Sequence, residues 1–212
     1  MQGMHDLFDV VRAGDLEVLI QMLDVHGLKI LDTRDESGIL PLGLGCFRTA
    51  FLWAADRGHL DIMREIVSRY GLKILKQLSI NGRTPLHMAA ASGKTAAVGR
   101  LMAWDDSMID ARDIYGCTPF GWAATFDHVP CMKLMYVNKG KAAEFLTQQD
   151  FDGNTALHTA AHFNNTATVE QLLKWGGEQD LPLLRISNHE GKTPWDCALG
   201  HPRIRQLMRR YG

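Results

Sequence analysis

Two histidines have the spacing that a metal site on a helix requires. His158 and His162 lie four residues apart, so both imidazoles would project from one side of a helix, as zinc ligands do. The residues between them are Thr159, Ala160 and Ala161, so the glutamate that follows the first histidine in hydrolytic zinc motifs is missing. We therefore expect no metal at this pair and predict a structural role for His158.

Two further groups of residues suggest catalysis or nucleotide binding but lack the partners that the chemistry needs. His189 and Glu190 form an adjacent acid–base pair, but no nucleophile accompanies them in the sequence. Gly43-Leu44-Gly45 contains two glycines of a nucleotide-binding loop without the third, which favours a flexible insertion. We expect no catalytic residue, no cofactor and no enzymatic activity.

The composition is that of an ordinary globular protein, and the charge pattern does not indicate a strongly charged partner. Of 212 residues, 46% are apolar, and the net charge of −1 includes no basic stripe of the kind that nucleic acid requires. Residues 1–9 lack the apolar core of a signal peptide, and Pro41 interrupts the apolar stretch 38–55. We expect an intracellular protein, cytoplasmic or nuclear, that contacts neither nucleic acid nor membrane. The four cysteines form no CxxC pair, which favours reduced thiols, and they are Cys46, Cys117, Cys131 and Cys197.

A short motif recurs along the chain and must position whatever side chains carry the function. It reads Gly-x-Thr-Pro, or Gly-x-Thr-Ala in one copy, and a pair of small residues follows it. The threonines Thr84, Thr118, Thr155 and Thr193 are successively 34, 37 and 38 residues apart, and a weaker copy at Thr49 precedes the first by 35 residues. A period of this length indicates an array of structural repeats.

Each copy of the motif predicts a turn followed by two antiparallel helices. The threonine can cap the first helix, and proline is favoured at the first helical position. The turn between the helices needs a residue that tolerates positive φ, and Gly58, Gly93, Asp127 and Asn164 occupy that place. The second helix carries an apolar stripe at helical spacing. A single unit cannot bury its apolar face, so neighbouring units must stack.

The motif resembles the ankyrin repeat, whose hallmark is Thr-Pro-Leu-His-x-Ala-Ala after an Asp-x-x-Gly turn. The nearest copies are Thr84–Ala90 and Thr155–Ala161, and the resemblance extends from about Leu7 to Met208. It implies a mainly all-α solenoid of stacked helix-turn-helix units joined by β-turn or hairpin-like loops. We expect one domain over residues 4–212 in a complete chain, with caps at both ends. Its units, about six, are predicted at 4–34, 35–78, 79–112, 113–149, 150–187 and 188–212.

Three units depart from the family pattern at the histidine position, where Leu52, Gly121 and Asp196 stand. In the family this histidine steadies the turn through hydrogen bonds to the backbone. We therefore expect these units to be less rigid or to be steadied by other contacts. Residues 39–48 form an insertion, and the long segments 138–149 and 176–187 are expected to be extended loops or extra helical turns.

The resemblance also implies that a protein partner binds on the concave face, at the turn tips and first helices. Apolar and aromatic side chains stand there in this sequence, where a merely solvated face would hold Lys, Glu, Ser or Asn. Packing stays open as an alternative, since longer loops could cover these side chains and Trp122 could belong to the core. The predicted partner-binding residues are Ile80, Arg83, Ile114, Tyr115, Trp122, Phe126, Phe151, Asn154, His162, Phe163 and Lys192.

The sequence therefore predicts a monomeric, non-catalytic scaffold or adaptor for a protein partner. The alternative is a regulatory or targeting subunit of an enzyme complex. On the first hypothesis, Tyr115→Ala or Phe126→Ala weakens partner binding and leaves the fold intact.

Overall fold

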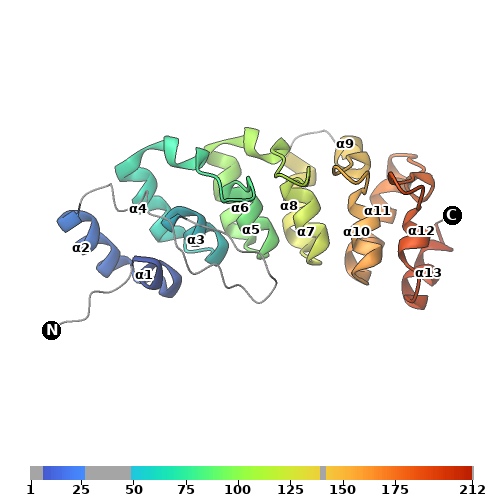
Figure 1. Cartoon of the computed structure of the whole chain (residues 1–212), viewed down its shortest axis with the longest axis horizontal. Coiled ribbons are helices and arrows are strands. Elements are labelled where there is room, and N and C mark those ends of the chain that lie inside the picture. The colour runs from blue at the N-terminus through green and yellow to red at the C-terminus, as the bar shows by residue number, and fades with distance from the viewer. Residues whose placement is uncertain (1–6, 27–48, 139–141, 212) are drawn as a thin grey trace.

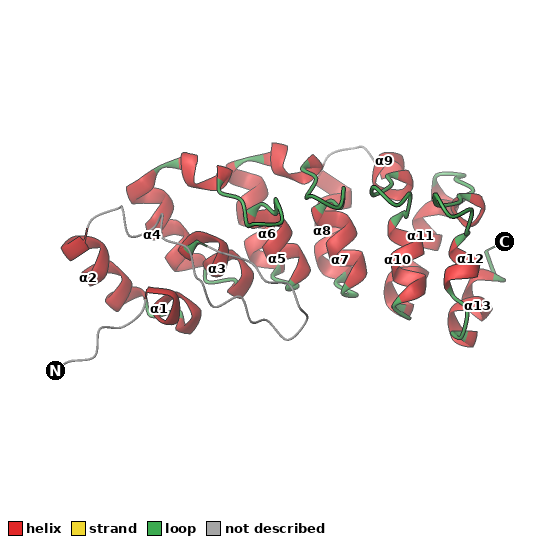
Figure 2. Cartoon of the chain, in the orientation of Figure 1, coloured by secondary structure: helices red, strands yellow, loops and turns green. Residues whose placement is uncertain are grey.

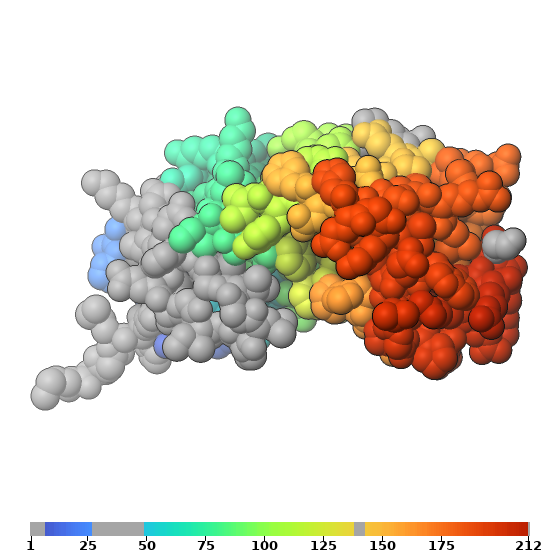
Figure 3. Space-filling view, turned by 45° about the vertical axis from the view of Figure 1, so that its right-hand side comes forward, coloured from blue at the N-terminus to red at the C-terminus, as the bar shows by residue number. Residues whose placement is uncertain are grey.

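The protein is a row of helical hairpins that follow one another in chain order. The computed structural model describes residues 7–26, 49–138 and 142–211, and within these ranges it contains helices and no strand (Figures 1 and 2). Helices α1 and α13 lie at opposite ends of the row, and the surface keeps the same order from one end to the other (Figure 3). The predicted helical solenoid is confirmed, whereas the insertion at 39–48 lies outside the described residues.

Six helix pairs make up the row among the described residues. They are α1 (Leu7–Ala13) with α2 (Leu16–His26), α3 (Ala50–Arg57) with α4 (Leu60–Tyr70), α5 (Pro85–Ala91) with α6 (Thr95–Trp104), α7 (Pro119–Thr125) with α8 (Val129–Asn138), α10 (Ala156–His162) with α11 (Thr166–Glu178), and α12 (Pro194–Cys197) with α13 (Pro202–Met208). The predicted unit boundaries stay a prediction, because the residues that join one helix pair to the next can be assigned to either unit.

Short helices occupy several of the connections between pairs. They are α9 (Ala142–Thr147) and the 3-10 helices η2 (Leu72–Lys76), η3 (Asp106–Asp110) and η4 (Leu183–Arg185). Two of the four, α9 and η4, fall in the long segments that were expected to hold extended loops or extra helical turns. These connections therefore contain additional helix.

Threonine caps the first helix of each typical unit, as predicted. In α5 the backbone N–H of His87 donates to Thr84 Oγ1 at 3.4 Å, while His87 Nδ1 accepts from the Thr84 N–H at 3.1 Å. Thr155 and His158 form the same reciprocal pair at α10. Such a pair satisfies amides that the first turn of a helix leaves without partners.

The turns between paired helices adopt the left-handed conformation that the sequence pattern predicts. The φ angles are 76° at Gly58, 67° at Gly93, 59° at Asp127 and 61° at Asn164. Asp and Asn are the non-glycine residues that enter this region at least cost. The alternation of Gly, Asp and Asn at one position of the repeat therefore follows from backbone geometry.

The core lies between neighbouring pairs, and small side chains allow the first helices to approach closely. The paired alanines of α3, α5, α7 and α10 are all fully buried, and α3, α5 and α7 pack extensively on one another. Close packing of this kind holds each unit against the next, so the row of units has one continuous interior.

Hydrogen bonds between successive turn tips align the loops that precede the first helices. In each case the first tip residue of one unit donates its backbone N–H to a carbonyl on the tip of the unit before. These bonds join Ile114 N to Asn81 O at 3.1 Å, Phe151 N to Tyr115 O at 3.0 Å, and His189 N to Asp152 O at 3.0 Å.

Glycine is required where one tip crosses the next. Gly116 has a φ of 76°, and a Cβ atom on it would lie 2.6 Å from Phe151 Cδ1 and 2.8 Å from Phe151 N. Any other residue there would be strained and would push the neighbouring tip away. The tips therefore form a continuous edge above the first helices.

Candidate functional site

An open groove lies where the tips of two neighbouring units meet helices α7 and α10. It has a volume of about 690 Å³, and its walls come from the tips 113–117 and 150–154, from α7 and α10, and from the residues that end those helices. We call it the central groove. Five of the predicted binding residues line it, namely Arg83, Tyr115, Trp122, Phe126 and Phe163.

The remaining predicted residues fall into two groups. Asn154, His162 and Lys192 line a neighbouring groove of about 370 Å³, which shares Asp152, Thr159 and Phe163 with the central groove. Ile80, Ile114 and Phe151 are exposed at the tips, with 51%, 55% and 62% of their surface accessible, and they line neither groove. Phe151 instead packs over Gly116, and Ile114 packs over Gly82.

Arg83 is buried, although its place in the repeat predicted an exposed tip residue. Only 2% of its surface is accessible. Its Nε atom lies 3.4 Å from Asp113 Oδ2, and its guanidinium carbon lies 3.8 Å from the centre of the Trp122 ring. The carboxylate and the indole face hold the guanidinium inside the protein, so Arg83 supports the groove wall and does not extend into solvent.

Asp113 connects this buried arginine to the tip loop. Its Oδ2 atom also accepts a hydrogen bond from Trp122 Nε1 at 2.9 Å, and its Oδ1 atom accepts from the backbone N–H groups of Tyr115 and Cys117, each at 3.0 Å. One carboxylate therefore fixes both the indole at the base of the groove and the loop that carries Tyr115.

The aromatic residues divide into a packed base and an exposed rim. Trp122 and Phe126 stack with ring centres 5.7 Å apart and an interplanar angle of 17°, and both are half-buried. Tyr115 and Phe163 keep 50% and 55% of their surface accessible. Packing thus accounts for part of the predicted set, and Phe126→Ala would remove internal contacts as well as groove surface. Among the aromatic residues that line the central groove, Tyr115 and Phe163 are the most exposed.

Two carboxylates give the groove a negative charge. Asp150 Oδ1 accepts from the backbone N–H groups of Asp152 and Asn154, at 3.0 and 2.8 Å, and the Asp152 side chain is exposed. Neither carboxylate forms an ion pair with any residue that the structure describes. Burial raises the pKa of the Cys117 thiol to about 12, with Asp113 and Asp150 adding to the effect, so this cysteine stays protonated and unreactive.

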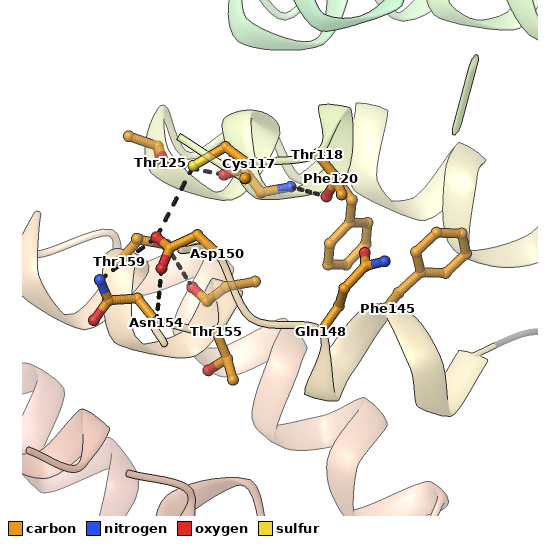
Figure 4. Close-up of a pocket in the computed structure, with 13 residues that line it drawn as sticks. Cys117, Thr118, Phe120, Thr125, Phe145, Gln148, Asp150, Asn154, Thr155 and Thr159 are labelled. Atoms are coloured by element: carbon orange, nitrogen blue, oxygen red, sulfur yellow. Dashed lines mark hydrogen bonds between the residues drawn. The ribbon is translucent and has the colours of Figure 1, made fainter. Parts of the chain in front are cut away.

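A small cavity of about 30 Å³ lies where Gly121 replaces the usual histidine. Figure 4 places Phe120, Phe145 and Gln148 on one side of it and Asp150 and Asn154 on the other. Phe120 and Phe145 stack with ring centres 5.2 Å apart, which supplies a contact across this junction. The unit is therefore steadied by aromatic packing in place of an imidazole.

The histidines of the typical units show what the cavity lacks. His87 Nε2 donates to the Cys117 carbonyl and His158 Nε2 to the Lys192 carbonyl, each at 3.1 Å, so each histidine joins its unit to the next. In the last unit Asp196 Oδ2 takes over the capping role, accepting from Thr193 N at 2.9 Å and from Thr193 Oγ1 at 2.7 Å.

Metal binding depends on His158 and the other possible metal ligands, and membrane insertion depends on the lengths of the helices. Both ring nitrogens of His158 are used within the protein, and burial lowers its pKa. Among residues 7–26, 49–138 and 142–211, no cluster of three or more His, Cys, Asp or Glu could hold a metal ion. None of the helices in these ranges is long and apolar enough to cross a membrane.

Several groove residues were not among the predicted ones. They are Cys117, Thr125, Asp150, Asp152, Thr159 and Asn165. Asp150 belongs to the Asp-x-x-Gly turn, so its position in the motif predicts a structural role and does not predict that it also lines the groove. Asn165 joins the two units, since its Nδ2 atom donates to the carbonyls of Ala124 and Thr125 at 2.9 and 2.7 Å. No local sequence signal distinguishes that asparagine.

Comparison with known families agrees with this architecture. A family model described as ankyrin repeats (3 copies) matches residues 7–103 and 51–148, and a model of the single ankyrin repeat matches residues 152–182. The chain belongs to the ankyrin-repeat family. Ankyrin repeats generally mediate protein–protein interactions and are generally non-catalytic.

The similar proteins are much longer than this chain. The transient receptor potential cation channel subfamily A member 1 homolog of Caenorhabditis elegans is 27% identical over 172 residues, which cover 68% of this chain and 14% of that protein. Inversin of Danio rerio is 38% identical over 77 residues, covering 34% of this chain and 7% of inversin. Human Rabankyrin-5 is 32% identical over 88 residues, covering 42% of this chain and 7% of Rabankyrin-5. The chain thus matches only a small part of each of these proteins.

Proposed function

We propose that this chain is a non-catalytic scaffold or adaptor that binds a segment of a protein partner in the central groove. The observation that carries the proposal is the pair Tyr115 and Phe163, two half-exposed aromatic side chains that face one open groove. Aromatic side chains in such positions are the residues that most often contribute binding energy at protein interfaces.

The rigidity of the groove supports the proposal. Asp113 holds the loop that carries Tyr115, and the backbone bond from Phe151 N to Tyr115 O ties that loop to the next tip. A surface that is already ordered loses little conformational freedom on binding, so more of the contact energy appears as affinity. The stacked base of Trp122 and Phe126 contributes to this order.

The charge and the cysteines bear on the kind of partner and its location. The groove carries two carboxylates, and its one guanidinium is paired with Asp113, which disfavours the phosphate backbone of a nucleic acid. Cys117, Cys131 and Cys197 are free thiols, as is common in reducing compartments. We therefore propose a protein partner, a monomeric chain, and a cytoplasmic or nuclear location.

A second candidate is a regulatory or targeting module within a larger assembly. The similar proteins favour it, because the matched region amounts to only 7% to 14% of their lengths. The same groove would serve both functions, and the identity of the bound protein would separate them: an enzyme bound stably and changed in activity indicates the regulatory role.

Affinity capture from native lysate with matched variants tests the proposal. The double variant Tyr115→Ala/Phe163→Ala removes the rim of the groove, and Leu199→Ala/Tyr211→Ala removes exposed apolar surface near the C-terminal end. We expect at least one protein to be retained by the wild-type chain and by the control but lost by the rim variant, at unchanged thermal stability. If the rim variant retains the same proteins as the wild type, the groove is not the binding surface.

A further inference from the structure

Among the described residues, the acids of the central groove lack a paired cation, whereas several other surface acids have one. Asp61 pairs with Arg64 at 2.5 Å, Asp9 with Arg12 at 2.8 Å, and Glu190 with Lys192 at 2.6 Å. No such ion pair forms at Asp150 or Asp152 among the described residues. Asp150 accepts hydrogen bonds through both oxygens, but neither it nor Asp152 has a cation beside it in the described ranges. A positive charge brought by a partner would therefore meet two carboxylates without a competing cation.

The single guanidinium in the groove wall does not cancel this charge. Arg83 is buried and paired with Asp113, so the pair as a whole is neutral. The pKa of the Cys117 thiol depends on the charges around it. Burial is the largest cause of its rise, Asp113, Asp150 and Asp152 raise it further, and Arg83 lowers it. Three carboxylates thus oppose one guanidinium at the base of the groove.

Two aromatic rings beside these carboxylates are free to contact a ligand. Arg83 already covers the Trp122 ring, with 3.8 Å between the guanidinium carbon and the ring centre. Among the described residues Tyr115 makes no ring contact, and the one ring contact of Phe163 is a T-shaped contact with His162, at 4.9 Å between ring centres. An aromatic face near a carboxylate suits a cation on an aliphatic stem, because the ring attracts the charge and packs against the methylenes.

We propose that the central groove receives a lysine or arginine side chain of the partner. Its charged end lies at Asp152 and Asp150, and its stem packs between Tyr115 and Phe163. The proposal rests on the proposed function above and adds the chemistry of the segment that is bound: a basic residue flanked by apolar ones. An acidic or phosphorylated segment would meet like charge in the groove, so it is the occupant that the same geometry disfavours.

A peptide selection tests this preference without knowledge of the natural partner. A random-peptide phage library is panned on the immobilised full chain, and binders that also bind Tyr115→Ala/Phe163→Ala are removed. We expect the remaining peptides to be enriched in a Lys or Arg beside apolar residues. Enrichment of acidic peptides, or of apolar peptides without a basic residue, overturns the proposal and leaves the groove as a binding surface. If no groove-dependent peptide is recovered, both this proposal and the proposed function fail.

A matched pair of charge variants then assigns the contact. The selected peptide is synthesised with a fluorescent label, and its affinity is measured by anisotropy against Asp152→Asn and Asp106→Asn. Both residues are exposed aspartates, but only Asp152 lines the groove. We expect Asp152→Asn to weaken binding about 5- to 10-fold, roughly 1 to 1.4 kcal/mol, and Asp106→Asn to leave it within about 2-fold.

A peptide in which the basic residue is replaced by glutamine completes the cycle. It should bind the wild type at least as weakly as the original peptide binds Asp152→Asn, because it loses the contacts with both carboxylates, and Asp152→Asn should not weaken its binding further. Equal losses for Asp152→Asn and Asp106→Asn would indicate general charge attraction and would contradict a seated cation.

Discussion

Asp113→Asn should destabilise the protein strongly while leaving its shape almost unchanged. Asp113 is 3% exposed, and its carboxylate is the only ion-pair partner of the buried Arg83 among the described residues. Only the Nε atom of Arg83 reaches Asp113, and its Nη2 atom has no hydrogen-bond partner among the residues that the structure describes. The amide of asparagine keeps the volume of the carboxylate but removes its charge, so the guanidinium stays buried with only the Trp122 ring to offset its charge.

The expected loss of unfolding free energy is about 3 kcal/mol. Removing one partner of a buried ion pair costs roughly 3–5 kcal/mol, and the lower end applies because the asparagine oxygen can still accept a hydrogen bond from a backbone N–H group. For a chain of 212 residues this corresponds to a fall in melting temperature of roughly 6–12 °C. Urea unfolding followed by circular dichroism measures the free energy directly.

Two further variants separate the lost ion pair from a general effect of the substitution. Asp152→Asn makes the same change at an exposed carboxylate and should stay within about 0.5 kcal/mol of the wild type. Arg83→Met combined with Asp113→Asn removes both charges and should recover part of the loss. If the free energy of unfolding of Asp113→Asn lies within about 1 kcal/mol of the wild-type value, the buried ion pair does not stabilise the groove wall.

Three other substitutions or conditions follow from the geometry. Burial lowers the pKa of His87 from 6.5 to about 4, so the unfolded chain takes up the proton at a higher pH than the folded one. The contribution of the neutral imidazole to the free energy of unfolding should be fully present above pH 6.5 and should fall by about 3 kcal/mol as the pH drops to 4. A urea midpoint that stays constant over that range contradicts this. Gly121→His should raise the free energy of unfolding by about 1 kcal/mol, because a Cβ there meets only Thr118 Oγ1, at 3.7 Å, and the imidazole can enter the cavity. An unchanged or lower free energy of unfolding would show that the imidazole does not fit. Gly116→Ala should cost about 2 kcal/mol in the same assay, since its Cβ would clash with Phe151, and a cost near zero would show that the tips can separate.

The repeat architecture could be predicted because its determinants are local. Threonine caps, small residues in the first helix and a left-handed residue between the helices each lie within a few positions of one another, and Asp127 and Asn164 adopt the positive φ that the pattern requires. The exposure of the tips was predictable for the same reason. Ile80 and Phe151 stand at fixed places in the turn, and both are exposed there.

The electrostatics of the groove could not be predicted from the repeat pattern. Arg83 and Asp113 lie 30 residues apart, in different units, and their contact depends on how two tips stack. The pattern assigns Arg83 to an exposed place, and only the indole of Trp122 and the carboxylate of Asp113 bring it inside. Likewise, Asp152 acquires a role only because the neighbouring tip places Tyr115 beside the same groove. The repeat motif specifies contacts within a unit but not the side-chain contacts between units.

Hydrogen–deuterium exchange on the full chain, free and bound to a retained protein or selected peptide, tests the central claim most directly. The central groove as the binding surface predicts protection of the backbone in the tips 113–117 and 150–154 and at the ends of α7 and α10. Protection confined to α6 and α8, with exchange at those tips unchanged, would place the partner elsewhere and contradict the account.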